Sequence, residues 1–165
     1  MFALSKRVII LNIKNMPQSL AQVYLHIVFS TKKRDPFISA DIESELYCYI
    51  GGIIKNLDAL PIIISGVEDH IHILTSFPRT ISIADFIKKI KAGSSYWIKS
   101  RGRRFQYFTW QGGYGAFSVS SSKKQAVINY IENQKVHHKK QTFQDELICF
   151  LKEYEVEYDE QYLWD

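Results

Sequence analysis

The sequence has little cysteine and little proline. Only two cysteines occur among 165 residues, Cys48 and Cys149, and neither lies in a CxxC motif or beside a histidine. This spacing excludes a zinc ribbon and a disulfide scaffold, and we expect a cytoplasmic protein because free thiols persist in reducing surroundings. Four prolines and eight glycines are too few for a collagen-like or low-complexity chain.

Long hydrophobic runs are also missing. The apolar run at residues 8–13 is interrupted by Asn12 and ended by Lys14, far short of the roughly 20 residues that a membrane-spanning helix needs. No signal-peptide cleavage pattern follows it, so we expect no membrane partner. Residues 1–21 are expected to be a peripheral N-terminal extension. Residues 22–165 then form a single domain with an acidic C-terminal tail, since a chain of this length builds one core.

Charge is divided unevenly along the chain. Residues 1–144 hold 20 basic and nine acidic side chains, whereas residues 145–165 hold one basic and eight acidic. Grouped basic residues beside aromatic ones attract a polyphosphate partner, although an ordinary solvated surface is the alternative explanation. The basic groups are Lys32, Lys33 and Arg34; Lys88, Lys89 and Lys91; and Arg101, Arg103 and Arg104.

Hydrophobic periodicity predicts four strands and four helices. The expected strands span residues 22–30, 61–67, 70–77 and 114–120, and the expected helices span about 40–57, 82–100, 123–140 and 142–154, with caps at Ser39 or Asp41, Ser82, Ser122 and Thr142. The second and third strands are joined by Glu68 and Asp69 alone, which indicates an antiparallel hairpin.

This order, βαββαβ followed by helices, predicts an α+β fold. We expect a four-stranded antiparallel sheet of ferredoxin-like or RRM-like type, with helices on one face and additional C-terminal helices.

His70 and His72 are two residues apart on the third expected strand. The period of two in a strand directs both imidazoles to one face of the sheet, and adjacent imidazoles form a two-point metal site. A His-x-His pair by itself more often indicates two half-exposed sheet residues, so other features have to support a metal site.

Tyr130 and Gln134 are four residues apart on the helix expected at 123–140, which places them on one helix face. If that helix lies across the sheet, its phenol and carboxamide reach the two imidazoles. A neutral oxygen there completes a site for a divalent ion that also holds a phosphate oxygen. Taken alone, Tyr130 is one of ten tyrosines, and packing explains it; the combination is rarer than its parts.

In this order, the residues resemble the HUH single-tyrosine transposases of small insertion sequences and their REP-associated relatives. The resemblance covers residues 23–164. It is carried by the segments YLHIVFSTKKR, GVEDHIHIL, IKKIKAGSSYWI, WQGGYGAFSVS, INYIENQKVHH and YDEQYLW.

The resemblance implies a DNA transposase that cuts and rejoins single-stranded DNA at hairpin-bearing ends. His70, His72 and Gln134 would hold a catalytic Mg²⁺ or Mn²⁺, and Tyr130 would be the nucleophile that forms a 5′-phosphotyrosine. A homodimer is implied, and no nucleotide cofactor. The chemistry suits a tyrosine beside a cation, because a phenol with a pKa of about 10 is a poor nucleophile at neutral pH without one.

Other residues receive supporting roles in this interpretation. His26 is expected to be a hydrogen-bonded structural histidine. Glu68 and Asp69 are expected to be hairpin-turn residues; the alternative is that they orient the metal-binding histidines, and Asp69 is the better candidate for that role. His137 and His138 lie near the end of the helix expected at 123–140, and His137 is expected to contact phosphate rather than the ion. Tyr107, Phe108 and Trp110 are expected to stack on bases, and the DNA phosphates are expected to contact Lys32, Lys33, Arg34, Lys88, Lys91, Arg103 and Arg104.

Two other functions fit part of the sequence. A non-catalytic RRM-like module would bind single strands with the same sheet, but it needs exposed aromatic residues on the central strands, where this chain has His70 and His72. A replication-initiator or relaxase-like HUH nickase would use the same histidines and tyrosine, but those relatives usually carry further domains, which 165 residues do not accommodate.

Overall fold

The computed structural model describes residues 20–138 and 141–164. The expected N-terminal extension, residues 1–21, falls mostly on residues 1–19 and so lies outside the described residues. The described part contains strands β1 (Tyr24–Ser30), β2 (Pro61–Val67), β3 (His70–Ser76) and β4 (Gly115–Val119), helices α1 (Ala40–Asn56), α2 (Ile83–Ser100), α3 (Lys124–Glu132), α4 (Gln134–His137), α5 (Phe143–Glu153) and α6 (Glu160–Leu163), and the short 3₁₀ turns η1 (Lys32–Arg34) and η2 (Arg103–Phe105).

The four strands form one sheet in the order β2-β3-β1-β4, and every pairing is antiparallel. The predicted fold class and the β2–β3 hairpin are therefore confirmed. β1 is a central strand, and six of its seven residues are buried. A strand buried on both faces reads as a nearly continuous hydrophobic run, which explains the composition of LHIVFS.

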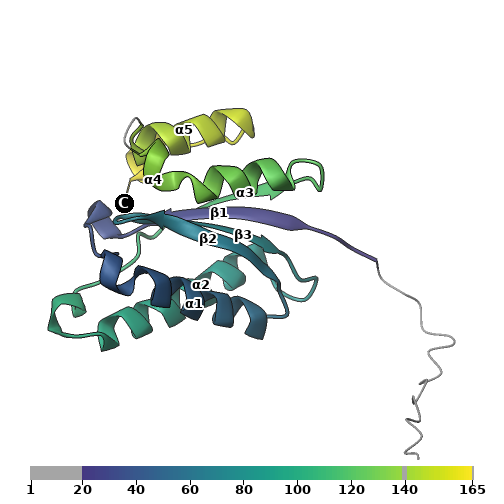
Figure 1. Cartoon of the computed structure of the whole chain (residues 1–165). Coiled ribbons are helices and arrows are strands. Elements are labelled where there is room, and N and C mark those ends of the chain that lie inside the picture. The colour runs from purple at the N-terminus through teal and green to yellow at the C-terminus, as the bar shows by residue number, and fades with distance from the viewer. Residues whose placement is uncertain (1–19, 139–140, 165) are drawn as a thin grey trace, which may run out of the picture.

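Helices cover both faces of the sheet, so the expectation of helices on one face is wrong. Figure 1 shows α1 and α2 on one side of the sheet and α3, α4 and α5 on the other. Alternate residues of β1 serve the two layers: Leu25, Ile27 and Phe29 join the large core under α1 and α2, and Val28 joins a second core under α5. The apolar surface of α5 requires this second layer, because residues 143, 147 and 151 recur on one helix face.

The helix expected at 123–140 is interrupted. It ends at Glu132, Asn133 has a φ of −93° and a ψ of 13°, and α4 begins at Gln134. The N-cap is Lys123 rather than Ser122, and it makes no side-chain cap hydrogen bond. Tyr130 and Gln134 therefore belong to two successive helices, and the argument that places them on one continuous helix face is wrong.

Two predicted caps are present. The hydroxyl of Ser82 accepts a hydrogen bond from the backbone N–H of Asp85 at the start of α2, and Thr142 does the same with Asp145 at the start of α5. α5 packs through Phe143, Leu147 and Leu151 against the second core, and this packing fixes its side chains over the sheet. Among the described helices, none is both long and apolar enough to cross a membrane.

Candidate metal centre and active site

His70 and His72 project from β3 toward the layer of α3, α4 and α5. Both side chains are fully buried, and their ring centroids lie 5.3 Å apart. Ile71 and Ile73 alternate with them and join the core on the opposite face. The two imidazoles thus share one face of the sheet, as the period of a strand requires.

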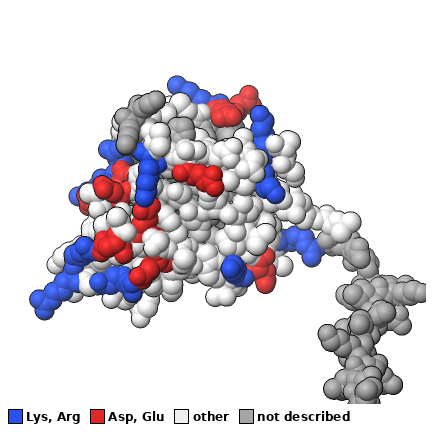
Figure 2. Space-filling model, viewed as in Figure 1, with Lys and Arg blue, Asp and Glu red and all other residues white. Residues whose placement is uncertain are grey.

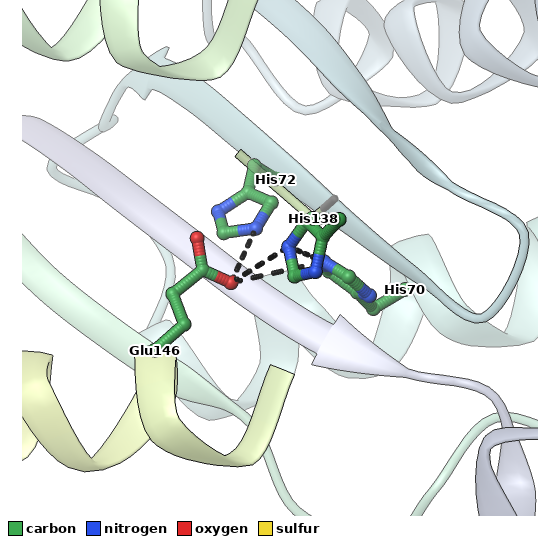
Figure 3. A group of neighbouring side chains, drawn as sticks. All are labelled: His70, His72, His138 and Glu146. Carbon is green, nitrogen blue, oxygen red and sulfur yellow. Dashed lines mark hydrogen bonds and ion pairs between the residues drawn. The ribbon is translucent and has the colours of Figure 1, made fainter. Parts of the chain in front are cut away.

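His138 and Glu146 complete a cluster around these histidines. One ligand atom from each of the four residues lies within 4.8 Å of all the others. Figure 3 shows the Glu146 side chain reaching from α5 toward the three rings. Its Oε2 lies 3.2 Å from Nε2 of His138 and 3.4 Å from Nε2 of His72, and Nε2 of His138 lies 2.9 Å from Nε2 of His70. Three separate elements of the fold therefore converge on one point.

Two buried atoms of this region lack a hydrogen-bond partner. They are Nε2 of His72 and Oε1 of Gln134. A buried polar atom without a partner costs free energy. Both atoms have lone pairs and are of the kinds that act as ligands of divalent cations. Imidazole nitrogens beside carboxylate and carboxamide oxygens suit Mn²⁺, and the oxygens suit Mg²⁺. The residues present therefore fit a divalent ion.

The electrostatics of the rings favour metal binding. Burial lowers the pKa of His72 well below its ordinary value, and the neighbouring His70 and His138 add to this effect. Burial and the neighbouring His72 lower the pKa of His26 in the same way. A neutral imidazole is the form that binds a metal ion, so His72 needs no deprotonation to serve as a ligand.

Tyr130 lies beside the cluster within the same chain. Its hydroxyl donates a hydrogen bond to Oε1 of Glu146, and its ring centroid is 6.0 Å from that of His72. Gln134 donates from Nε2 to the same Oε1 at 3.0 Å. The side chains of Tyr130 and Gln134 thus lie beside the cluster that contains His70 and His72, although the two residues belong to different helices.

Glu146 is a site residue that the sequence reasoning missed. It is 4% exposed, and burial raises its pKa to about 7, against the opposing effect of His70 and with a smaller contribution from Asp69. A signal was present in the sequence: an acidic residue stands between Phe143 and Leu147, on the buried side of an amphipathic helix, where a charged group needs partners.

The supporting residues lie close to their expected places. Asp69 lies in the β2–β3 turn, and its Oδ1 is 2.6 Å from Nδ1 of His70. Although burial alone would raise it, the contact with His70 holds the pKa of Asp69 below its ordinary value. His26 is a hydrogen-bonded histidine, with Nε2 2.9 Å from Nδ1 of His72. His138 belongs to the cluster, whereas the side chain of His137 lies outside the described ones.

The expected DNA-contacting residues differ in their surroundings. The ammonium group of Lys91 donates to the carbonyl oxygens of Gln111 and Gly113 at 2.9 and 2.6 Å, and burial lowers its pKa to about 8. Arg104 is paired with Asp41 in α1. On the face seen in Figure 2, Lys and Arg side chains form separate groups, and acidic side chains lie between some of them.

The aromatic residues expected to stack on bases are mostly buried. Phe108 and Trp110 belong to the core under α1 and α2, so the expectation that they stack on bases is wrong. Tyr107 is 87% exposed and remains available to a base.

A cavity of about 960 Å³ borders the cluster. Its lining includes Asp69 and His138 from the site, the basic residues Arg34 and Lys135, and the acidic residue Glu43. Of the basic groups in the sequence, the one in η1 contributes a residue, Arg34, to this lining.

Comparison with known proteins gives consistent results. The model of the family "Transposase IS200 like" matches residues 19–134. The fold is similar to that of a candidate transposase from Deinococcus radiodurans R1, with a TM-score of 0.57, 21% identity, and coverage of 73% of this chain and 97% of that one. It is also similar to a REP-associated tyrosine transposase bound to a REP hairpin, with a TM-score of 0.55, 11% identity, and coverage of 75% and 73%. No curated protein matches the chain.

Proposed function

This chain belongs to the family of IS200-like transposases, and from that premise we propose that it cuts and rejoins single-stranded DNA in the cytoplasm through a covalent bond to Tyr130. The observation that carries the proposal is the shared carboxylate of Glu146. Its Oε1 accepts hydrogen bonds from Tyr130 and Gln134, and its Oε2 faces His72 and His138. One side chain thus connects the nucleophile to the candidate metal ligands.

The proposed reaction conserves the energy of the DNA backbone. The Tyr130 oxygen bonds to the scissile phosphorus as its proton leaves, the bond from phosphorus to the 3′ oxygen breaks, and that oxygen takes up a proton. A 5′-phosphotyrosine and a free 3′-OH result. Attack by another 3′-OH on the phosphotyrosine restores a phosphodiester and releases Tyr130, so no nucleotide cofactor is needed.

We propose His70, His72, Glu146 and Gln134 as the residues that hold Mg²⁺ or Mn²⁺, with His138 beside them. When bound, the ion would supply positive charge to the scissile phosphate. Gln134 is the ligand that the sequence suggested, and its unpartnered Oε1 supports that role. Glu146 adds a carboxylate oxygen, and its Oε1 orients the hydroxyl of Tyr130.

The proposed substrate is single-stranded DNA with hairpin ends. The REP-associated transposase is similar in fold and is described as bound to a REP hairpin, which supports a hairpin as the partner. η1 borders the site cavity, so Lys32, Lys33 and Arg34 are proposed to contact phosphates near the cleaved bond. Lys88, Arg103 and Arg104 belong to the layer of α1 and α2 and are proposed to contact DNA farther from it, whereas Lys91 would have to exchange its carbonyl partners for a phosphate.

A homodimer is proposed as the assembly. Sedimentation is expected to give about twice the chain mass of 19.3 kDa. A 19.3 kDa species alone, persisting at high protein concentration, would contradict the dimer without affecting the chemistry.

The test of the proposed function is formation of a covalent adduct. Labelled single strands from both flanks of the gene are incubated with Mg²⁺ or Mn²⁺ and separated on a denaturing gel. We expect an adduct with the wild type, none with Tyr130→Phe or His70→Ala, and retained DNA binding by Tyr130→Phe. Tyr96→Phe, which removes a hydroxyl from a side chain that is 78% exposed, is the matched control and should behave as the wild type.

The same gel separates the alternative functions. Binding of hairpin-bearing strands without cleavage or adduct would favour an RRM-like binding module and make His70 and His72 structural. An adduct with nicking but no rejoining to a second strand would favour a replication-initiator or relaxase-like nickase. Full activity of Tyr130→Phe would exclude Tyr130 as the nucleophile.

A further inference from the structure

His26 is a buried histidine at the centre of the sheet, and its polar contact leads to the metal centre. It lies on β1, is 1% exposed, and neighbours His72 diagonally across the β1–β3 pairing, because its direct partner is Leu74. The two imidazoles are stacked, with centroids 5.2 Å apart and an interplanar angle of 25°. Their facing nitrogens, Nε2 of His26 and Nδ1 of His72, are 2.9 Å apart.

A hydrogen bond between two ring nitrogens contains one proton, and its position decides what His72 offers to the cluster. If the proton is on Nδ1 of His72, this N–H donates the hydrogen bond to Nε2 of His26, and Nε2 of His72 has a free lone pair. If His26 donates instead, a neutral His72 carries its proton on Nε2. Both rings are buried, where a charged imidazolium would have a large desolvation cost, so these two neutral arrangements are the ones to compare.

The surroundings of Nε2 of His72 favour the first arrangement. This atom is buried and has no hydrogen-bond partner, and the nearest carboxylate oxygen, on Glu146, lies 3.4 Å away. The second arrangement would bury an N–H group that makes no hydrogen bond with this oxygen, and buried donors without partners are rarer in proteins than buried acceptors without them. The first arrangement leaves a lone pair, which an ion can use directly.

We propose that His26 is a positioning residue that fixes the tautomer of His72, so that Nε2 of His72 is held ready to bind the divalent ion. The inference rests on the proposed function, since it concerns the metal centre assigned there. Metal-binding histidines commonly donate their second ring N–H to a carboxylate, a carbonyl or water. Here Nδ1 of His70 contacts the carboxylate of Asp69, whereas Nδ1 of His72 contacts the neutral imidazole of His26.

The difference between the two supports follows from their depth. The Asp69 side chain is 25% exposed, so water stabilises its charge. His26 is enclosed by the rings of Phe117, Tyr130 and Phe150, with centroid distances of 6.3, 6.3 and 5.1 Å. A carboxylate in that place would be a buried charge with a large desolvation cost. A neutral imidazole accepts the same hydrogen bond and leaves the charge of the ion undiminished.

Two substitutions separate the hydrogen bond from packing. His26→Phe keeps an aromatic ring among the neighbouring rings and removes the acceptor. His26→Gln restores a polar atom near the place of Nε2, and its carbonyl oxygen can accept from Nδ1 of His72. Phe150→Leu, which changes a ring against His26 without touching a polar atom, is the matched control for packing.

The first measurement is the tautomer of His72 in the full-length, metal-free protein, read from long-range ¹H–¹⁵N correlation spectra. We expect the wild type, His26→Gln and Phe150→Leu to show a protonated Nδ1 and an unprotonated Nε2. His26→Phe is expected to show a proton on Nε2 or a mixture. A wild-type His72 protonated on Nε2, or a tautomer unchanged in His26→Phe, would overturn the proposal.

The second measurement is binding of Mn²⁺ alone, by calorimetry. His26→Phe is expected to bind roughly 10–100 times more weakly, with recovery in His26→Gln and little change in Phe150→Leu. Equal affinity of His26→Phe and wild type would overturn the role of His26 while leaving the metal centre intact. Failure of the wild type itself to bind Mn²⁺ or Mg²⁺ would overturn the metal centre, and the tautomer spectra would then decide only whether His26 orders the ring.

Discussion

The carboxyl group of Glu146 is buried in surroundings that favour its protonated form when no metal ion is bound. It is buried among three histidine rings, it accepts the hydroxyl of Tyr130, and burial raises its pKa to about 7. An ionised carboxylate at this depth is stabilised only by hydrogen bonds or by a cation. In the absence of a metal ion, the folded protein therefore keeps a proton on Glu146 in a pH range where the unfolded chain has released it.

This property predicts how stability depends on pH. Because the pKa is higher in the folded state than the ordinary value of 4.5, the contribution of Glu146 is present below about pH 4.5 and is lost as the pH rises toward 7, at most about 3 kcal/mol. The measurement is urea unfolding in EDTA at pH 5 and pH 7.5. The free energy of unfolding of wild type minus that of Glu146→Gln should be smaller at pH 7.5 than at pH 5.

The comparison with Glu146→Gln isolates this residue. His26 and His72 have lowered pKa values, so they make the protein more stable as the pH rises toward 6.5, and they are present in both proteins. An identical pH dependence in wild type and variant would show that Glu146 is ionised in the folded protein without metal.

At this scale the sequence predicted part of the site. The period of a strand places His70 and His72 on one sheet face. Tyr130 and Gln134 follow from the resemblance, because the break at Asn133 removes the argument from their spacing. The sequence marks Glu146 as an acidic residue on the buried side of an amphipathic helix, but its place beside β3 depends on packing of α5 on the second core, which no local pattern predicts.

Among the elements, the β2–β3 hairpin is the one that positions both histidines. Gly66 lies opposite Ile71 in this hairpin. A Cβ atom at Gly66 would lie 2.2 Å from the carbonyl oxygen of His70 and 2.9 Å from the Cα of Ile71, and backbone cannot yield as a flexible side chain can. The close approach of the two strands therefore requires glycine.

Gly66→Ala is expected to lower the free energy of unfolding by about 1–3 kcal/mol, as overpacking does, and to weaken Mn²⁺ binding by displacing His70. Gly52→Ala is the control: it lies in α1, where a Cβ meets nothing within 4 Å, and alanine should stabilise that helix by up to about 1 kcal/mol. Thermal unfolding and calorimetry test both variants. A Gly66→Ala protein as stable as wild type would contradict the required close approach.

The sequence predicted most strands and helices, but it missed a helix break and the helices on the second face of the sheet. Strands and capped helices were predicted because their signals are local: β-branched runs, a two-residue link in the hairpin, and Ser82 and Thr142 as caps. The break at Asn133 was missed because residues 123–140 contain neither proline nor glycine to mark it. The second helical layer was missed although β1 has the nearly continuous hydrophobic run of a strand buried on both faces, because such a run does not show which elements cover each face.

At the scale of the whole molecule, the acidic segment, residues 145–165, lies beyond the part of the chain that the family model matches. The match ends at residue 134, and α5, which lies beyond it, supplies Glu146 and covers the sheet face of the candidate site (Figure 1). Within a single chain, Tyr130 already contacts Glu146 and lies beside His72. One chain thus contains a complete set of candidate catalytic groups, even if two chains associate.

This arrangement predicts the outcome of mixing two inactive variants. Tyr130→Phe keeps the histidines but lacks the nucleophile, and His70→Ala keeps the nucleophile but lacks a ligand. If each site uses the tyrosine of its own chain, their mixture should form no covalent adduct with hairpin-bearing single strands in Mn²⁺. Each variant mixed with wild type should leave the wild-type adduct in place, which controls for inhibition, and size tags on the two chains identify the chain that carries the DNA. An adduct on the His70→Ala chain in the mixture of the two variants would show that its Tyr130 had served the histidines of a second copy, so that association of two chains would be part of the active site itself.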